Sequence, residues 1–307
     1  MNEYVLRTHR ITKQYKNDYA LKSVDLNVRK GDIYGFIGQN GAGKSSLIRI
    51  AVGLSIPTDG TVKLFGESST GSLALARKRM GVIVESPALL PHMTAHENLE
   101  VHRLQRGIPG KECISKTLAL VGLEDTGKKK AKNFSLGMKQ RLGLAGALLH
   151  EPEFLILDEP TNGLDPMGII ELRELIKTLN REKGLTVLIS SHILSELHLL
   201  ADRYGFIHKG ELLEEMSAKE LNEKCKQHLR IRVNHAEKAA SVIETELHTT
   251  DFEVMPDGTI KLYRYLDDVR KVSVALTASG LIIEQFMPMG DDLESYFTKL
   301  VGGDVHE

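Results

Sequence analysis

Short apolar runs of strand length recur along the first two thirds of the chain, and segments with helical periodicity separate them. The runs that we predict as buried strands lie at residues 33–37, 81–84, 154–157 and 185–190. Strands that are apolar throughout and alternate with helices are typical of a parallel sheet with crossover helices. We therefore predict an α/β fold, in which two β-like runs at residues 4–8 and 21–28 precede the sheet.

A mostly helical insert interrupts this pattern between about residues 86 and 150. Thr94 and Glu97 have the spacing of a capping box, which begins a helix by satisfying free backbone N–H groups. Two further helices are predicted over residues 115–121 and 137–149. The insert indicates that the sheet-containing domain carries a helical subdomain.

Composition changes after residues 206–211, where a hairpin-like sequence ends the first pattern. The polar segment 217–227 is predicted to be a linking helix. Beyond it the order is β-α-β-β-α-β and a last helix, which is the ferredoxin-like arrangement. The predicted elements are strands at 229–233, 251–255, 259–263 and 281–285, and helices at 236–247, 266–279 and 292–301.

These patterns divide the chain into a main domain, residues 1–217, a linker, 218–227, and a small α+β accessory domain, 228–307. No catalytic constellation occurs in the accessory domain, so we expect it to act in dimerisation or regulation. Met287 and Met289 are expected to pack inside it.

Bulk composition excludes several classes of protein. The 307 residues are 41% hydrophobic and 26% charged with a formal net charge of −1, so the chain lacks the basic field of nucleic-acid binders. Cys113 and Cys225 lack metal-ligand spacing and indicate a reducing compartment. The first ten residues do not resemble a signal peptide, and no run approaches the roughly 18 apolar residues that cross a bilayer. We expect a cytoplasmic protein that reaches membranes only through a partner.

A phosphate-binding pattern lies between a predicted strand and a predicted helix. Residues 38–46, GQNGAGKSS, match G-x-x-x-x-G-K-[ST]. The glycines let successive backbone N–H groups face phosphate oxygens, and the helix N-terminus adds positive potential. Lys44 is predicted to reach the β- and γ-phosphates, and the Ser45 hydroxyl to ligate Mg²⁺. The predicted nucleotide contacts here are Gly38, Asn40, Gly41, Gly43, Lys44, Ser45 and Ser46.

Two carboxylates end the predicted strand at residues 154–157. Asp158 suits water-mediated binding of Mg²⁺. Glu159 is placed to orient or deprotonate an attacking water. Because Asp-Glu is also common at solvated strand ends, this assignment depends on the phosphate-binding pattern upstream. Together the two motifs predict nucleotide hydrolysis rather than binding alone.

With these motifs in order, the chain resembles the ATP-binding subunits of ABC transporters over residues 1 to about 217. Further matches are FSLGMKQ at 134–140 in the place of the signature motif, Pro160 after the carboxylates, GLD at 163–165, and His192 after an apolar strand. The resemblance implies the fold of a P-loop ATPase with a helical subdomain, with ATP and Mg²⁺ as ligands.

The same resemblance implies roles for single residues. Tyr15 matches the aromatic residue that stacks on adenine, and His192 matches the histidine that senses the γ-phosphate. Asp165 lies in the loop through which paired subunits communicate. Lys44, Glu159 and His192 form the predicted catalytic set.

The family mechanism needs two ATPase domains that enclose two ATP molecules. Each ATP lies between the phosphate loop of one domain and the signature motif of the other. Ser135 looks like the N-cap of a helix that starts near Gly137, and the N-terminus of that helix would point at the γ-phosphate across the interface. We therefore predict a functional pair, a homodimer or two copies on one transporter, with multi-span membrane permease subunits.

Two departures from the usual family pattern stand out. In the signature motif, Leu136 replaces a glycine and Met138 replaces the glutamine, which removes side-chain contacts from position 138. Glu85 aligns with a glutamine that offers Mg²⁺ a neutral oxygen. A glutamate there should strengthen a metal contact and raise repulsion with phosphate when metal is absent.

Glu85 and the SLGMKQRL-type signature resemble the bacitracin-resistance and lantibiotic-immunity branch of exporters. Two alternatives remain open. A soluble ABC protein that acts on ribosomes or nucleic acid is one, although this chain has one phosphate loop and no sustained heptads. An importer ATPase with a regulatory C-terminal domain is the other, and Glu85 disfavours it. The expected location is the cytoplasmic face of the membrane, through the permease.

Overall fold

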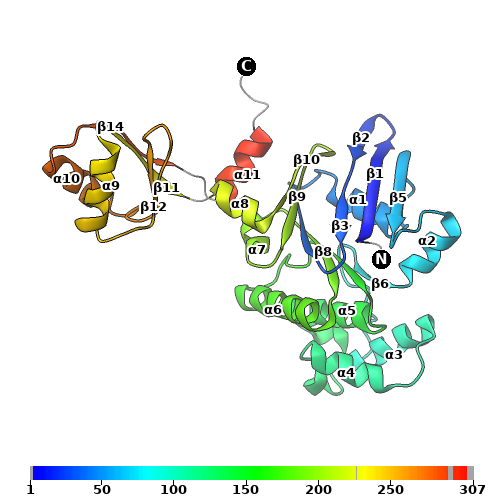
Figure 1. Ribbon diagram of the computed structural model, residues 1–307. Coiled ribbons are helices and arrows are strands. Elements are labelled where there is room, and N and C mark those ends of the chain that lie inside the picture. Colours follow the sequence, from blue (N-terminus) through cyan, green and yellow to red (C-terminus); the bar gives the residue numbers. More distant parts are fainter. Residues whose placement is uncertain (1–2, 226, 290–292, 303–307) are drawn as a thin grey trace. The chain divides into compact units, whose positions relative to one another are not determined.

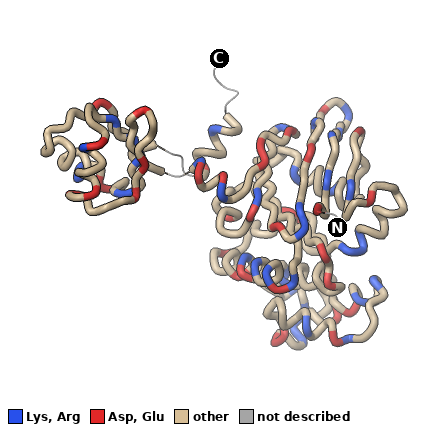
Figure 2. Tube along the Cα trace, viewed as in Figure 1, with Lys and Arg blue, Asp and Glu red and all other residues tan. Residues whose placement is uncertain are grey.

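The computed structural model describes residues 3–225, 227–289 and 293–302. Contacts divide the chain into two compact units, residues 1–218 and 219–307, and each is described by itself (Figure 1). Lys and Arg are interspersed with Asp and Glu along both units (Figure 2). Within the described residues, no helix combines the length and the apolar character that a bilayer crossing requires.

A six-stranded sheet forms the centre of the first unit, in the order β10-β9-β4-β8-β7-β6. Five of its strands are parallel, and only β10 runs antiparallel to its neighbour β9. The strands are β4 (Ile33–Ile37), β6 (Met80–Ile83), β7 (Phe154–Asp158), β8 (Thr186–Ser191), β9 (Arg203–His208) and β10 (Glu211–Ser217). Every residue of β4, β7 and β8 is buried, which explains their continuous apolar sequences.

A second, antiparallel sheet is built around β1 (Tyr4–Tyr15), which pairs with β2 (Asp18–Val24), β3 (Asn27–Arg29) and β5 (Asp59–Leu64). The predicted strand at 4–8 was too short, and the run at 21–28 is two strands. Side chains interrupt the backbone ladder between β2 and β3, because Leu26 N–H donates to the Thr8 hydroxyl and Arg10 N–H donates to the Asp25 carboxylate instead of to backbone carbonyl oxygens.

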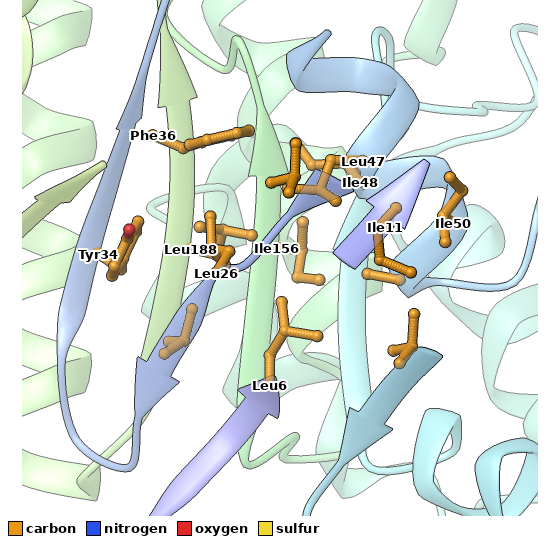
Figure 3. Close-up of a cluster of buried hydrophobic side chains, with 14 of the residues drawn as sticks. Leu6, Ile11, Leu26, Tyr34, Phe36, Leu47, Ile48, Ile50, Ile156 and Leu188 are labelled. Atoms are coloured by element: carbon orange, nitrogen blue, oxygen red, sulfur yellow. The ribbon is translucent and has the colours of Figure 1, made fainter. Parts of the chain in front are cut away.

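The helix α1 (Lys44–Ala51) packs between the two sheets and unites them in one core. Figure 3 shows Leu47 and Ile48 of α1 near Ile156 of the central sheet, with Leu6 and Ile11 of β1 in the same cluster. All five side chains are at most 2% exposed. Because α1 begins directly after the loop at residues 38–43, this core fixes the position of that loop.

The helical insert consists of α3 (Ala95–Arg106), α4 (Glu112–Leu120) and α5 (Leu136–Leu148), with 3₁₀ turns at Glu124–Thr126 and Ala131–Asn133. In Figure 1, α3 and α4 lie at the end of the first unit that is away from β1. The predicted capping box is confirmed: Thr94 N–H donates to Glu97 Oε2 at 2.7 Å, and Glu97 N–H donates to Thr94 Oγ1 at 3.2 Å. The sequence prediction did not name α2 (Thr70–Arg77), α6 (Pro166–Lys183) and α7 (Leu194–His198).

The second unit begins in α8 (Ala218–Cys225) and contains a four-stranded antiparallel sheet in the order β12-β13-β11-β14. Its elements are β11 (His228–Val233), α9 (Ala236–Thr245), β12 (Phe252–Val254), β13 (Ile260–Leu262), α10 (Val269–Ala278), β14 (Ile283–Met289) and α11 (Leu293–Gly302). The two helices α9 and α10 cover one face of the sheet (Figure 1). This strand order supports the ferredoxin-like arrangement expected from the sequence.

Two expectations for this unit were wrong in detail. The helix predicted from residue 266 begins at Val269, because Asp268 is its N-cap and accepts a bond from Lys271 N–H at 3.2 Å. Met287 and Met289 do not pack inside the unit, since they lie on β14 with exposed fractions of 43% and 37%.

One histidine of the first unit should make stability pH-dependent. His150 Nε2 lies 3.1 Å from the Met80 carbonyl, and burial, followed by the charge of Arg106, lowers the pKa of His150 to about 4. The unfolded chain takes up a proton near pH 6.5, so the contribution of His150 is complete above about pH 6.5 and is lost as the pH falls towards 4. Because the ring is partly exposed, we expect this loss to be about 1–2 kcal/mol.

Urea unfolding of His150→Gln and of the wild type at pH 7, 5.5 and 4 measures this effect. The difference in unfolding free energy between the two proteins should shrink with falling pH. His92→Gln, at an exposed histidine, is the matched control and should keep a constant difference. A difference for His150→Gln that does not change with pH would contradict the expectation.

Candidate functional site

The phosphate loop connects the buried strand β4 to α1 and contains two glycines that no other residue can replace without strain. Gly41 and Gly43 have φ angles of 81° and 113°. At Gly43 a Cβ atom would also lie 2.6 Å from the Ala20 carbonyl oxygen. Gly38 is equally confined, since a Cβ there would lie 2.5 Å from the Ile207 carbonyl oxygen. The backbone is therefore free to face a ligand because these positions carry no side chain.

Lys44, the first residue of α1, is held inside this loop. Its side chain is only 5% exposed, and its ammonium donates to the carbonyl oxygens of Gly38 and Gln39. The Nζ atom also lies 3.0 Å from Glu159 Oε1. A buried ammonium is stable only with such compensation, and a phosphate group offers the same kind of partner. Asn40 is exposed at the loop, and Ser45 and Ser46 are half-buried in the first turn of α1.

The carboxylate pair is organised by a serine that the sequence prediction missed. Parallel pairing places Asp158 of β7 opposite Ser190 of β8. The Ser190 hydroxyl donates to Asp158 Oδ1 at 2.7 Å and accepts a bond from Glu159 N–H at 2.9 Å. Ser190 and Ser191 are recognisable in the sequence before His192. The contact of Ser190 with the carboxylate pair depends on strand register, however, which the sequence does not show.

Asp158 retains one oxygen that fits a metal ligand. The side chain is 1% exposed, and Oδ2 is buried without a hydrogen-bond partner. A buried carboxylate oxygen without a partner is destabilising, and a hard divalent cation such as Mg²⁺ binds oxygen ligands of this kind. The donor set of Asp158 and the Ser45 hydroxyl therefore fits Mg²⁺.

Glu159 lies between Lys44 and His192. Its Oε2 is 2.7 Å from His192 Nδ1, while Oε1 faces the Lys44 ammonium. The Glu159 side chain is 14% exposed, and its backbone has a left-handed φ of 51°. Such a φ is unfavourable for a non-glycine residue and persists where surrounding contacts impose it. The structure thus brings together all three residues of the predicted catalytic set.

Tyr15 ends β1 and its ring is 47% exposed. The Lys13 ammonium lies 4.8 Å from the ring centroid. An exposed aromatic ring beside a cation suits stacking on a flat, electron-rich base. The adenine contact stays a prediction.

Glu85 follows β6 and pairs with a residue that sequence reasoning missed. Its carboxylate accepts a bond from the Arg49 guanidinium, which belongs to α1 one turn beyond Ser45. Glu85 has a left-handed φ of 63°. The positive charge of Arg49 compensates the negative charge that glutamate carries and glutamine lacks. The expected repulsion between Glu85 and phosphate is therefore weaker. Metal binding by Glu85 stays a prediction.

The signature motif and the loop at 163–165 lie side by side and line one cavity. Ser135 is the N-cap of α5, as predicted, and accepts a bond from Met138 N–H at 3.2 Å. Asp165 is the N-cap of α6 and accepts one from Gly168 N–H at 2.9 Å. The cavity lining includes Ser135, Leu136, Gly137, Gln140, Gly163, Leu164 and Asp165.

The two signature departures have different surroundings. Leu136 is 51% exposed and covers Gly163, where a Cβ atom would lie 2.6 Å from Leu136 Cδ2. Met138 instead packs against the core of the helical insert. The side chain at position 138 therefore contributes to packing within the insert, while Leu136 is available at the cavity.

Known proteins with similar sequences and structures agree with this geometry. The sequence model of the ABC transporter family matches residues 21–162. The bacitracin transport ATP-binding protein BcrA of Enterococcus faecalis is 42% identical over 98% of this chain and 97% of its own length. The lantibiotic transport ATP-binding protein SrtF of Streptococcus pyogenes is 44% identical over 69% of this chain and 90% of its own.

A solved dimeric ATP-binding cassette, in a post-hydrolysis state with ADP and phosphate, superimposes with a TM-score of 0.64 and 28% identity. It covers 69% of this chain and 98% of its own. The match therefore spans a length close to that of the first unit alone.

Proposed function

This chain belongs to the ABC transporter ATP-binding family and hydrolyses ATP, and from that premise we propose that it drives an exporter which removes a peptide antibiotic from the cell envelope. The observation that carries the proposal is the 42% identity to a bacitracin transport ATP-binding protein over 98% of the chain. The similarity to the lantibiotic transport protein covers 69% of the chain. Of these two relatives, the bacitracin one matches the second unit as well.

We propose the following roles for the residues of the site. The backbone N–H groups of the phosphate loop and the Lys44 ammonium hold the β- and γ-phosphates. Glu159 orients the attacking water and accepts its proton, and His192, bonded to Glu159 at 2.7 Å, keeps that carboxylate in position and faces the γ-phosphate. Tyr15 stacks on adenine. Because Lys44 pairs with Glu159 here, the arriving phosphate replaces Glu159 as the partner of Lys44 and leaves the carboxylate to act as a base.

Mg²⁺ bound with ATP would neutralise phosphate charge and polarise the γ-phosphate. Asp158 and Ser45 are the residues that would hold it, and Glu85 is a further candidate once its bond to Arg49 is released. Ser135 and Gly137, at the N-terminus of α5, would contact the γ-phosphate held by a second copy. Asp165 would line the contact between the copies.

The proposed assembly has two copies of this chain on a multi-span permease, at the cytoplasmic face of the membrane. The dimeric relative supports the pairing. A role on ribosomes or nucleic acid and a role in import are less well supported, because a relative that matches 98% of this chain is a bacitracin transport protein.

Co-expression with a candidate multi-span permease from the same genome, in a bacitracin-sensitive bacterium, tests the proposal. The permease and this chain should co-purify, and the cells should tolerate several-fold more bacitracin than cells with the permease alone. Cells with the Glu159→Gln variant, made at the same level, should gain no protection. Unchanged sensitivity to bacitracin and to a lantibiotic, with the complex intact, would overturn the export proposal.

A further inference from the structure

A buried glutamine connects the signature helix to the peptide that follows Glu159. Gln140, in the second turn of α5, is 9% exposed, and its Nε2 donates to the Pro160 carbonyl at 2.9 Å. A side-chain amide is buried in this way only where it forms a hydrogen bond, because a buried polar group without a partner is destabilising. The bond joins α5 to the residue next to Glu159, across 20 positions of sequence.

A second set of bonds joins the same loop to the segment that carries His192. The Thr161 hydroxyl donates to Glu196 Oε2 at 2.7 Å, and the Ser191 hydroxyl donates to the same oxygen at 3.0 Å. Thr161 and Ser191 are 7% and 1% exposed. Bonds to a carboxylate are the stronger kind of hydrogen bond. The loop after Glu159 is thereby held between α5 on one side and the His192 segment on the other.

Two more contacts join α5 to this loop and to α6, which follows it. Leu136 covers Gly163, as described above. Arg141, adjacent to Gln140, forms an ion pair with Glu171 of α6 at 3.3 Å. Displacement of the N-terminus of α5 is therefore expected to displace the loop that begins at Pro160, chiefly through the buried bond from Gln140 to Pro160, since buried contacts shift in discrete steps rather than deform freely.

We propose that Gln140 is a positioning residue that couples the N-terminus of α5 to Glu159 of the same chain. The proposal rests on the paired arrangement of the proposed function. In that pair, α5 of one copy meets the ATP held by the other, so binding at one site moves α5. Gln140 passes this movement to Pro160 and so sets the orientation of Glu159 at the second site. The two sites then hydrolyse ATP cooperatively.

Gln140→Leu removes the bond at similar volume and leaves the Pro160 carbonyl buried without a donor. In the full-length protein we expect kcat for ATP hydrolysis to fall about 10-fold or more, because small displacements of a catalytic group have large effects. The Hill coefficient for ATP should fall to about 1. The affinity of the unpaired chain for ATP should not change, because Gln140 does not belong to the phosphate loop.

Gln140→Glu separates positioning from a general loss of stability. At neutral pH the carboxylate cannot donate to Pro160, whereas its protonated form can. Activity relative to wild type should therefore recover as the pH falls, whereas a defect that does not depend on this hydrogen bond would stay constant. Gln105→Leu, the same substitution at an exposed position of α3, is the matched control and should keep the wild-type kcat and Hill coefficient.

Two results would overturn the proposal. One is a wild-type Hill coefficient and kcat in Gln140→Leu. The other is a Gln140→Glu defect that has the same size at every pH. Both are read from ATPase assays on the purified protein, whereas failure of the export proposal is read from bacitracin protection in cells, so the two failures are distinguishable.

Discussion

Glu159→Gln is expected to lower kcat for ATP hydrolysis by about 10²–10⁴-fold, the range for loss of a general base, while ATP still binds. Glutamine keeps the shape of the side chain and can still meet His192, but it cannot accept the proton of the attacking water. The substitution also removes the negative charge that lies 3.0 Å from Lys44, so the ammonium is more available to phosphate. Phosphate release under saturating ATP and equilibrium binding of ATP measure the two halves of this expectation.

The same variant reports on pairing, because ATP that is bound and not hydrolysed should hold two copies together. Light scattering with saturating ATP should then show twice the mass of the nucleotide-free protein. Glu174→Gln, at an exposed glutamate of α6, is the matched control and should hydrolyse ATP at the wild-type rate. Substantial residual hydrolysis by Glu159→Gln would exclude Glu159 as the base.

Lys44→Met should abolish ATP binding at concentrations that saturate the wild type. The Lys44 ammonium is the charged group that lies within the phosphate loop. Methionine occupies a similar volume but carries no charge. Two charge-assisted hydrogen bonds to phosphate contribute about 1.5–3 kcal/mol each, so the dissociation constant should rise by at least about 10²-fold. Isothermal titration with ATP and with ADP measures the change.

Loss of Lys44 also leaves Glu159 buried without its partner, so reduced stability must be separated from reduced binding. Breaking a buried ion pair by removing one member destabilises by about 3–5 kcal/mol. The double variant Lys44→Met with Glu159→Gln removes both charges and should regain much of this stability, yet it should still not bind ATP. If the double variant bound ATP as the wild type does, Lys44 would have no direct part in phosphate binding.

The sequence predicted the parts of this site that depend on residues close to one another in the chain. Residues 38–46 carried the complete phosphate loop, and Asp158-Glu159 followed a run of buried strand residues. Ser135 was predicted as an N-cap, and the structure has it in that role. Such features can be predicted from sequence because turn formation and helix capping depend on residues only a few positions apart.

Contacts between distant segments could not be predicted in the same way. Arg49 at Glu85, Ser190 between Asp158 and Glu159, and Gln140 at Pro160 each join residues 20 or more positions apart. The partner of a side chain that lies this far away in the sequence depends on strand register and helix packing. Many different residues are compatible with the same register and packing, so the sequence does not identify the partner.

By itself the sequence determined the α/β class, four strands of the central sheet and the nucleotide-binding loop, since periodicity and local turn geometry leave few other folds open. Only the tertiary structure decided that Lys44, Glu159 and His192 form one connected group, and that α5 is bonded to the loop after Glu159. The physical reason is that parallel strands bring their carboxyl ends to one edge of the sheet, so chemistry spread over more than 140 residues converges there.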